Sequence, residues 1–72
     1  PLSRAHLTGR EKQCLLWSAE GKTTWETSHI LGVSERTVVF HLQNASEKLN
    51  VVSRQQAVAR AVSLGLITPQ IG

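Results

Sequence analysis

The sequence predicts an all-α fold, a four-helix bundle, and three observations lead to that prediction. Apolar residues recur at helical spacing, no segment shows the strict alternation of a strand, and glycines and capping residues punctuate the chain regularly. We expect helices over about residues 9–20, 25–31, 35–49 and 54–64. The 72 residues make one domain, 1–72, with its core within about residues 7–67.

The first two helices have clear start and stop signals. Thr8 and Glu11 have the spacing of a capping box, and Gly21 supplies a left-handed residue at the end. Thr24 is the expected N-cap of the second, short helix, with Glu26 near its positive end.

The third and fourth helices are delimited in the same way. Gly32 ends the second helix and Ser34 caps the third. Ser53 and Gln56 form another capping box, which opens a helix that ends near Gly65.

The connection between the second and third helices is short and contains a glycine. Gly32-Val33-Ser34 suits two helices that cross steeply, as in a helix-turn-helix, with Val33 pointing inward. In such a unit the second helix lies in the DNA major groove with its N-terminal part at the bases. The sequence therefore predicts a DNA-binding module whose recognition helix is 35–49.

The recognition helix has two different sides. One is aliphatic and is expected to be buried; it consists of Val38, Leu42, Ala45 and Leu49. The other mixes polar, charged and apolar groups and consists of Arg36, Val39, Phe40, Gln43 and Glu47. Adjacent exposed apolar residues usually mark a contact surface, so this side is expected to bind a partner.

The fourth helix has an apolar stripe that is too wide for one core. Ala57, Ala61 and Leu64 are expected to face the other helices. A second, small strip is predicted to form a two-fold homodimer contact; it consists of Gln55, Val58, Ala59 and Val62. The alternative is that the two valines of this strip only widen the edge of the core.

Composition agrees with a polyanionic partner. Eight Lys and Arg oppose five Glu, giving a net charge of +3 and a pI near 9.8. Cys14 is the only cysteine, so no intrachain disulfide is possible, which fits a cytoplasmic location. No Cys–His spacing resembles a zinc site, and no cofactor or membrane contact is predicted. Lys12, Lys48 and Arg60 are treated as solvated cations.

The strings LTGRE, GKTTWE, ILGVSERTV, FHLQNASEKLNV and SRQQAVARAV together resemble the LuxR-type helix-turn-helix domain over about residues 7–67. Within that family, GKTTWE, the Phe-His pair and the ending LGLI are similar to the acyl-homoserine-lactone receptors of quorum sensing. The phosphorylation-controlled response regulators share the domain and remain the alternative.

The resemblance implies the C-terminal domain of a longer bacterial transcription regulator that dimerises through the last helix on inverted repeats. The small-molecule autoinducer would bind an N-terminal domain absent from this chain, and RNA polymerase is a candidate partner. The base-reading positions are Val39, Phe40 and Gln43. The predicted DNA-backbone residues are Lys22, Thr24, Trp25, Ser34, Arg36, Thr37 and Asn44, although Trp25 could instead pack locally.

The chain departs from the family pattern at several places. Thr27 and Ser28 stand where an aliphatic residue and Ala are usual, and Ala45 replaces a larger aliphatic residue, so we expect a thin core and modest stability. Val39 replaces a polar or basic residue, which puts a family hydrogen bond at this position in doubt.

Two other classes of function lead to different expectations. A protein-interaction module would use Val39 and Phe40 to dock a partner helix, and its binding should respond little to salt. An enzyme is not predicted, because the sequence has no paired carboxylates, no nucleophile with a base, and no phosphate-cradling glycine loop.

Overall fold

A computed structural model describes residues 6–69, which form four helices and no strand. α1 spans Gly9–Ala19, α2 spans Thr24–Leu31, α3 spans Glu35–Lys48 and α4 spans Arg54–Ser63. The predicted all-α class is confirmed, and each helix ends within one residue of its expected bounds. The outermost parts of the predicted domain, residues 1–5 and 70–72, lie outside the described residues.

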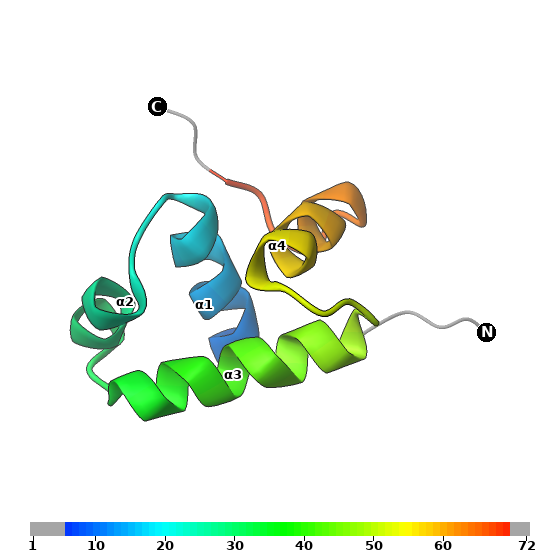
Figure 1. The fold of residues 1–72 in the computed structure, drawn as a ribbon. Helices are drawn as coiled ribbons and strands as arrows, with labels where there is room; N and C mark the ends of the chain where they lie inside the picture. Colours follow the sequence, from blue (N-terminus) through cyan, green and yellow to red (C-terminus); the bar gives the residue numbers. More distant parts are fainter. Residues whose placement is uncertain (1–5, 70–72) are drawn as a thin grey trace.

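α3 runs along one side of the molecule, and the other three helices pack against it (Figure 1). α1 also contacts both α2 and α4, so it lies between them. No helix within residues 6–69 is long and apolar enough to cross a membrane.

The predicted capping boxes of α1 and α4 are both present, but the cap of α2 is one residue earlier than expected. The Thr23 hydroxyl accepts the Glu26 N–H at 3.0 Å, and the Glu26 carboxylate accepts the Thr23 N–H at 2.8 Å. Thr24, the predicted N-cap, is instead the first helical residue. The reason is the spacing of the capping box, which places the cap three residues before the glutamate.

A left-handed residue follows every helix. Gly21, Gly32 and Gly65 have φ of 87°, 71° and 74°, as the sequence predicted for helix ends. After α3 the same conformation is taken by Asn50, with φ 60°. Asn tolerates this region better than most other non-glycine residues.

The core lies where α1, α3 and α4 meet. It consists of Leu7, Cys14, Leu15, Val38, Leu42, Ala45, Leu49, Ala57, Ala61 and Ile67. The predicted buried side of α3 is therefore confirmed in full.

The expectation that Leu64 faces the other helices is wrong, because its side chain is 56% exposed. Leu64 follows the last residue of α4, and the chain turns there through Gly65. The Leu66 N–H donates to the Ala61 carbonyl at 2.8 Å and directs the following residue, Ile67, into the core. Ile67, which lies beyond the predicted helix, is therefore the buried residue at this end of the chain, and Leu64 is not.

One ion pair joins α1 to the end of α3. The Lys48 ammonium lies 2.8 Å from Glu11, which is only 3% exposed, so Lys48 is not the solvated cation that the sequence suggested. Burial alone would raise the pKa of Glu11, but hydrogen bonds from Lys48 and the Thr8 N–H outweigh it. The net effect lowers the pKa of Glu11.

The two polar departures in α2 are buried and hydrogen-bonded. The Thr27 hydroxyl donates to the Thr23 carbonyl at 2.9 Å, and the Ser28 hydroxyl donates to the Trp25 carbonyl at 2.7 Å. Since both hydroxyls are satisfied, their burial costs less than an unpaired polar group would.

Candidate nucleic-acid interface

The turn between α2 and α3 sets the angle at which α3 is presented. Gly32 caps α2 in the left-handed conformation, with φ 71° and ψ 34°. The Val33 N–H donates to the Ser28 carbonyl at 3.0 Å, and its half-buried side chain packs against the core. The prediction that Val33 points inward is confirmed. The turn thereby holds α2 against α3 and leaves the far side of α3 uncovered.

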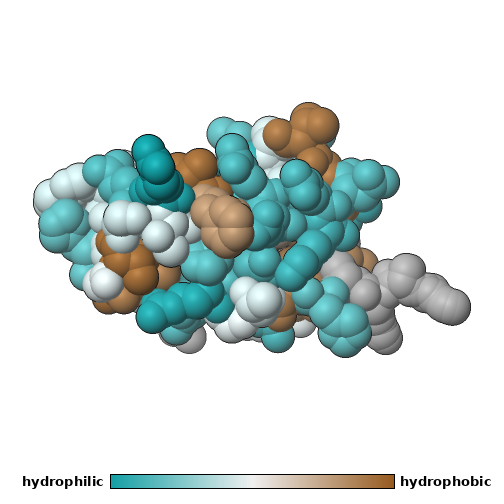
Figure 2. All heavy atoms as spheres, turned by 90° about the horizontal axis from the view of Figure 1, so that it is seen from below, coloured by the Kyte–Doolittle hydropathy of each residue, from teal (hydrophilic) through white to brown (hydrophobic). Residues whose placement is uncertain are grey.

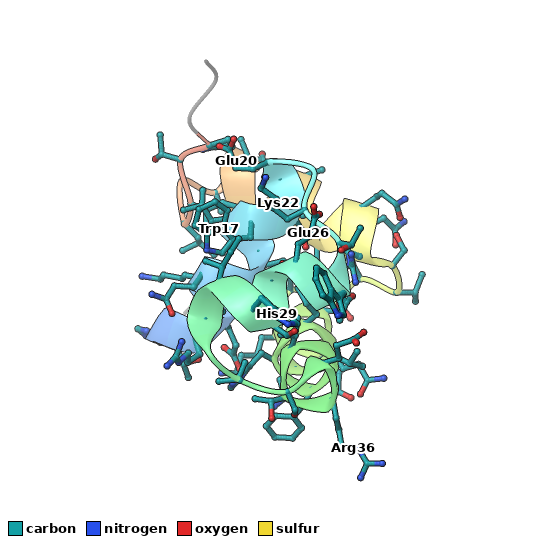
Figure 3. The ribbon with its side chains drawn as sticks, turned by 90° about the vertical axis from the view of Figure 1, so that its left-hand side faces the viewer. Trp17, Glu20, Lys22, Glu26, His29 and Arg36 are labelled. Carbon is teal, nitrogen blue, oxygen red and sulfur yellow. The ribbon has the colours of Figure 1, made fainter. Side chains whose placement is uncertain are left out.

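The outer side of α3 carries the residues that the helical wheel placed there. Val39 and Phe40 are 40% and 56% exposed, whereas the neighbouring Val38 is fully buried. Gln43 is exposed as well, and Arg36 extends away from the body of the molecule (Figure 3). Seen from the side on which α3 lies, the surface is mostly hydrophilic with separate apolar patches (Figure 2). This mixture suits a polar ligand that also offers methyl groups.

Two hydroxyl groups, those of Ser34 and Thr37, lie close together at the start of α3. The Ser34 hydroxyl accepts the Thr37 N–H at 3.1 Å and lies 3.0 Å from the Thr37 hydroxyl. Ser34 is exposed and Thr37 is half-buried. The Ser34 side chain therefore caps the helix and remains accessible to solvent. Asn44, also predicted to contact the DNA backbone, is half-buried in the second half of the helix.

The start of α2 carries the other predicted backbone residues. Lys22 is half-buried on the connection that precedes the helix (Figure 3). Trp25 is 56% exposed, and its ring lies on that of His29 with centroids 4.0 Å apart. Trp25 therefore does make a local contact, as one of its two interpretations required, while much of its ring stays accessible.

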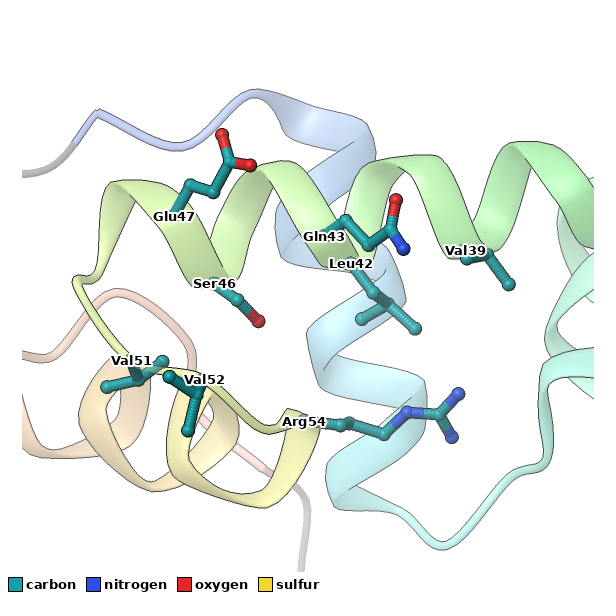
Figure 4. A pocket seen from close by; sticks show the side chains of 8 residues that line it. All are labelled: Val39, Leu42, Gln43, Ser46, Glu47, Val51, Val52 and Arg54. Atoms are coloured by element: carbon teal, nitrogen blue, oxygen red, sulfur yellow. The ribbon is translucent and has the colours of Figure 1, made fainter.

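An open groove runs between α3 and the start of α4. Its lining consists of Val39, Leu42, Gln43, Ser46, Glu47, Val51, Val52 and Arg54 (Figure 4). Two of the three predicted base readers, Val39 and Gln43, lie along it, and Phe40 does not. Glu47 is an unfavourable neighbour for phosphate, but its carboxylate points away from Arg54 (Figure 4).

Arg54 is the residue that sequence reasoning missed. Its guanidinium donates to the Thr24 hydroxyl at 2.6 Å, so the first residue of α4 is joined to the first residue of α2. The two residues are 30 positions apart. The sequence offers only a basic residue directly after a helix cap, which is too common to single out.

Several charged groups lie near the exposed side of α3 and the start of α2. The Thr23 N–H and the charge of Lys22 lower the pKa of Glu26, so that carboxylate stays ionised beside the cation. Arg36 and Arg54 form no ion pair with a carboxylate within residues 6–69. Over the same range, no three His, Cys, Asp or Glu side chains gather as a metal site would require.

Comparison with known proteins decides the family. The family model for bacterial regulatory proteins of the luxR family matches residues 5–61. The chain belongs to the luxR family. The resemblance seen in the sequence motifs is therefore confirmed.

The curated relatives of this luxR-family domain are transcription regulators. The transcriptional activator protein LuxR of Aliivibrio fischeri is 54% identical over 65 residues, which cover 90% of this chain and 26% of that protein. The quorum sensing-dependent transcriptional regulator RpaR of Rhodopseudomonas palustris is 54% identical over 67 residues, covering 93% and 28%. The chain thus spans about a quarter of the length of the curated relatives it matches.

Solved structures share the arrangement of this luxR-family domain. The structure of the transcription factor GerE matches with a TM-score of 0.84 and 35% identity, over 90% of this chain and 97% of that one. The structure of Escherichia coli SdiA matches with a TM-score of 0.85 and 40% identity, over 94% of this chain and 29% of that one.

The predicted dimer strip of the luxR-family domain is only partly free. Gln55 and Ala59 are exposed and Val62 is 41% exposed. Val58 is half-buried and packs against the core. The alternative considered from the sequence, that the valines widen the edge of the core, therefore describes Val58 and not Val62.

Proposed function

We propose that this luxR-family domain binds double-stranded DNA in a sequence-specific manner, with α3 in the major groove. The observation that carries the proposal is the exposed side of α3, where Val39, Phe40 and Gln43 face outward next to the glycine turn. Gln43 can pair with adenine through two hydrogen bonds, and Val39 can contact a thymine methyl group. The relatives are transcription regulators, and we propose that this domain has no enzymatic activity.

The proposed contacts with the DNA backbone surround this reading surface. They are Lys22, Thr24, Trp25, Ser34, Arg36, Thr37 and Asn44. The cations Lys22 and Arg36 would supply sequence-independent attraction, which the net charge of +3 supports.

We further propose that the chain, 1–72, is the DNA-binding domain of a longer cytoplasmic regulator controlled by quorum sensing. Support comes from the relatives, of whose length this chain matches about a quarter and which include a quorum sensing-dependent regulator. In this proposal an autoinducer binds the region outside this chain, and RNA polymerase is a partner of the assembled regulator. A phosphorylation-controlled response regulator is the alternative, and the relatives favour it less.

The DNA-binding proposal is tested with randomised duplexes and a salt titration. We expect one enriched site, and Gln43→Ala should weaken binding to it by about 1–3 kcal/mol while relaxing the preference at one base pair. Gln13→Ala, an exposed glutamine on α1, is the matched control and should bind normally. An equal loss on specific and scrambled duplexes would remove Gln43 from base reading.

The salt titration separates DNA binding from protein docking. Lys22→Ala and Arg36→Ala should each weaken all duplexes and lower the salt slope by about one unit. Lys12→Ala, an exposed cation on α1, is the control. Binding that hardly changes with salt would instead support a protein partner for Val39 and Phe40.

A homodimer on an inverted repeat is proposed through the strip Gln55, Val58, Ala59 and Val62 of α4. A two-fold contact there would place two recognition helices about one DNA turn apart. Because Val58 also packs against the core, the better test is Ala59→Glu with Val62→Glu. We expect normal circular dichroism, retained half-site binding and loss of cooperative binding to the full repeat. Cooperative filling of both half-sites by the double variant would exclude this strip.

A further inference from the structure

Arg54 links two helices that do not otherwise pack on each other within the described chain. It is the first residue of α4, its side chain is exposed, and its guanidinium donates to the Thr24 hydroxyl at 2.6 Å. An exposed arginine side chain normally samples many rotamers, and ordering it costs free energy. The hydrogen bond to Thr24 holds the guanidinium in one place before any ligand arrives.

That place is the junction of two grooves. Arg54 lines the groove that contains Val39 and Gln43, and its side chain extends along it away from Glu47 (Figure 4). Arg54 also lines a second groove, between α4 and the α1–α2 connection, together with Lys22 and Thr23. The guanidinium therefore stands between the proposed base readers and a proposed backbone cation.

The chemistry of the held group fits a phosphodiester. A guanidinium has five N–H donors, and the structure uses one of its nitrogens on Thr24. Arg54 forms no ion pair with a carboxylate over residues 6–69, so its charge is not neutralised within that range. The Thr24 hydroxyl accepts from Arg54 and can still donate its own proton to a further oxygen. Planar donors of this kind bind phosphate oxygens in pairs.

We propose that Arg54 binds a DNA phosphate at the edge of the major groove and that Thr24 is the residue that positions its guanidinium. This inference rests on the proposed DNA binding and extends it to α4, for which the sequence predicts core packing and a dimer contact. It makes the start of α4 part of the DNA surface, opposite Val39 and Gln43 across the groove.

The test compares three variants of the 72-residue chain on specific and scrambled duplexes over a range of salt. Arg54→Ala should weaken both duplexes about tenfold and lower the salt slope by about one unit, because one phosphate contact is lost. Thr24→Val should weaken both duplexes less and keep the slope, because the charge remains but is no longer held. Arg54→Lys should also keep the slope, with weaker binding, since an ammonium lacks the planar pair of donors.

Arg60→Ala provides the matched control, an exposed arginine on the same helix that lines neither groove. Circular dichroism melting accompanies each variant. If Arg54→Ala only lowers the melting temperature and binds both duplexes with the affinity and slope of the parent, Arg54 is a structural link and the inference is wrong. If Thr24→Val binds like the parent, the positioning role of Thr24 is excluded. If the parent itself binds no duplex, the proposed DNA binding is wrong. That outcome is distinguishable from a parent that binds DNA without using Arg54.

Discussion

The two sides of α3 differ in what surrounds them although they share one helix. Val38 and Val39 are adjacent and chemically identical, yet Val38 is fully buried and Val39 is 40% exposed. Val38 faces the core with Leu42 and Ala45, while Val39 faces the groove with Gln43. Neighbouring residues of α3 therefore differ in burial because of helical phase, so substitutions at adjacent positions should affect different properties.

We expect the largest loss of stability from a substitution on the buried side of α3. Leu42→Ala should lower the free energy of unfolding by about 2–5 kcal/mol, because it leaves a cavity in the core of a small domain. Thermal and urea melts followed by circular dichroism measure this. Val39→Ala, three residues earlier and 40% exposed, should stay within about 0.5 kcal/mol of the parent. Equal losses of unfolding free energy in the two variants would show that the assignment of buried and exposed residues on α3 is wrong.

The next largest effect concerns the ion pair between Lys48, at the end of α3, and Glu11 of α1. Lys48→Met keeps an aliphatic stem but leaves the buried Glu11 carboxylate without its cation. We expect a loss of about 2 kcal/mol at pH 7, less than for a fully buried pair because Lys48 is partly exposed. Lys12→Met, an exposed lysine on α1, is the matched control and should change little.

The same pair predicts a dependence of stability on pH. The pKa of Glu11 is lowered in the folded protein, so its contribution is fully present above the unfolded glutamate pKa of about 4.3. It is lost as pH falls from there through the folded pKa. The difference in unfolding free energy between parent and Lys48→Met should therefore shrink below about pH 4. A constant difference across that range would mean that the pair does not stabilise the fold.

The N-cap of α3 should contribute less to stability than the core or the ion pair. Ser34→Ala removes the hydroxyl that accepts the Thr37 N–H, so we expect a loss of about 0.5–2 kcal/mol in unfolding free energy. Ser34→Asp should restore the cap and its stability while weakening DNA binding, because it places a negative charge at the proposed phosphate contact. Melting curves and duplex titrations measure the two properties separately. Restored stability with unchanged DNA affinity would take Ser34 out of the DNA surface.

Much of the fold could be predicted because its signals are local. The capping boxes at Thr8 and Ser53 depend on residues three positions apart, and the left-handed ends at Gly21 and Gly32 depend on single residues. The sequence predicts the N-cap of α2 one residue too late, at Thr24 instead of Thr23. Local signals allow such an error because either of two adjacent threonines can cap a helix.

By itself the sequence determined the four helices, their ends and the two sides of α3, since hydrogen bonds and side-chain periodicity within a helix follow from nearby residues. The motifs also identified the luxR family. Only the tertiary structure decided which distant side chains meet. It paired Lys48 with Glu11 across 37 positions and Arg54 with Thr24 across 30, and it buried Ile67 while leaving Leu64 exposed. These contacts depend on how the helices cross and where the chain turns, and no local spacing encodes that geometry.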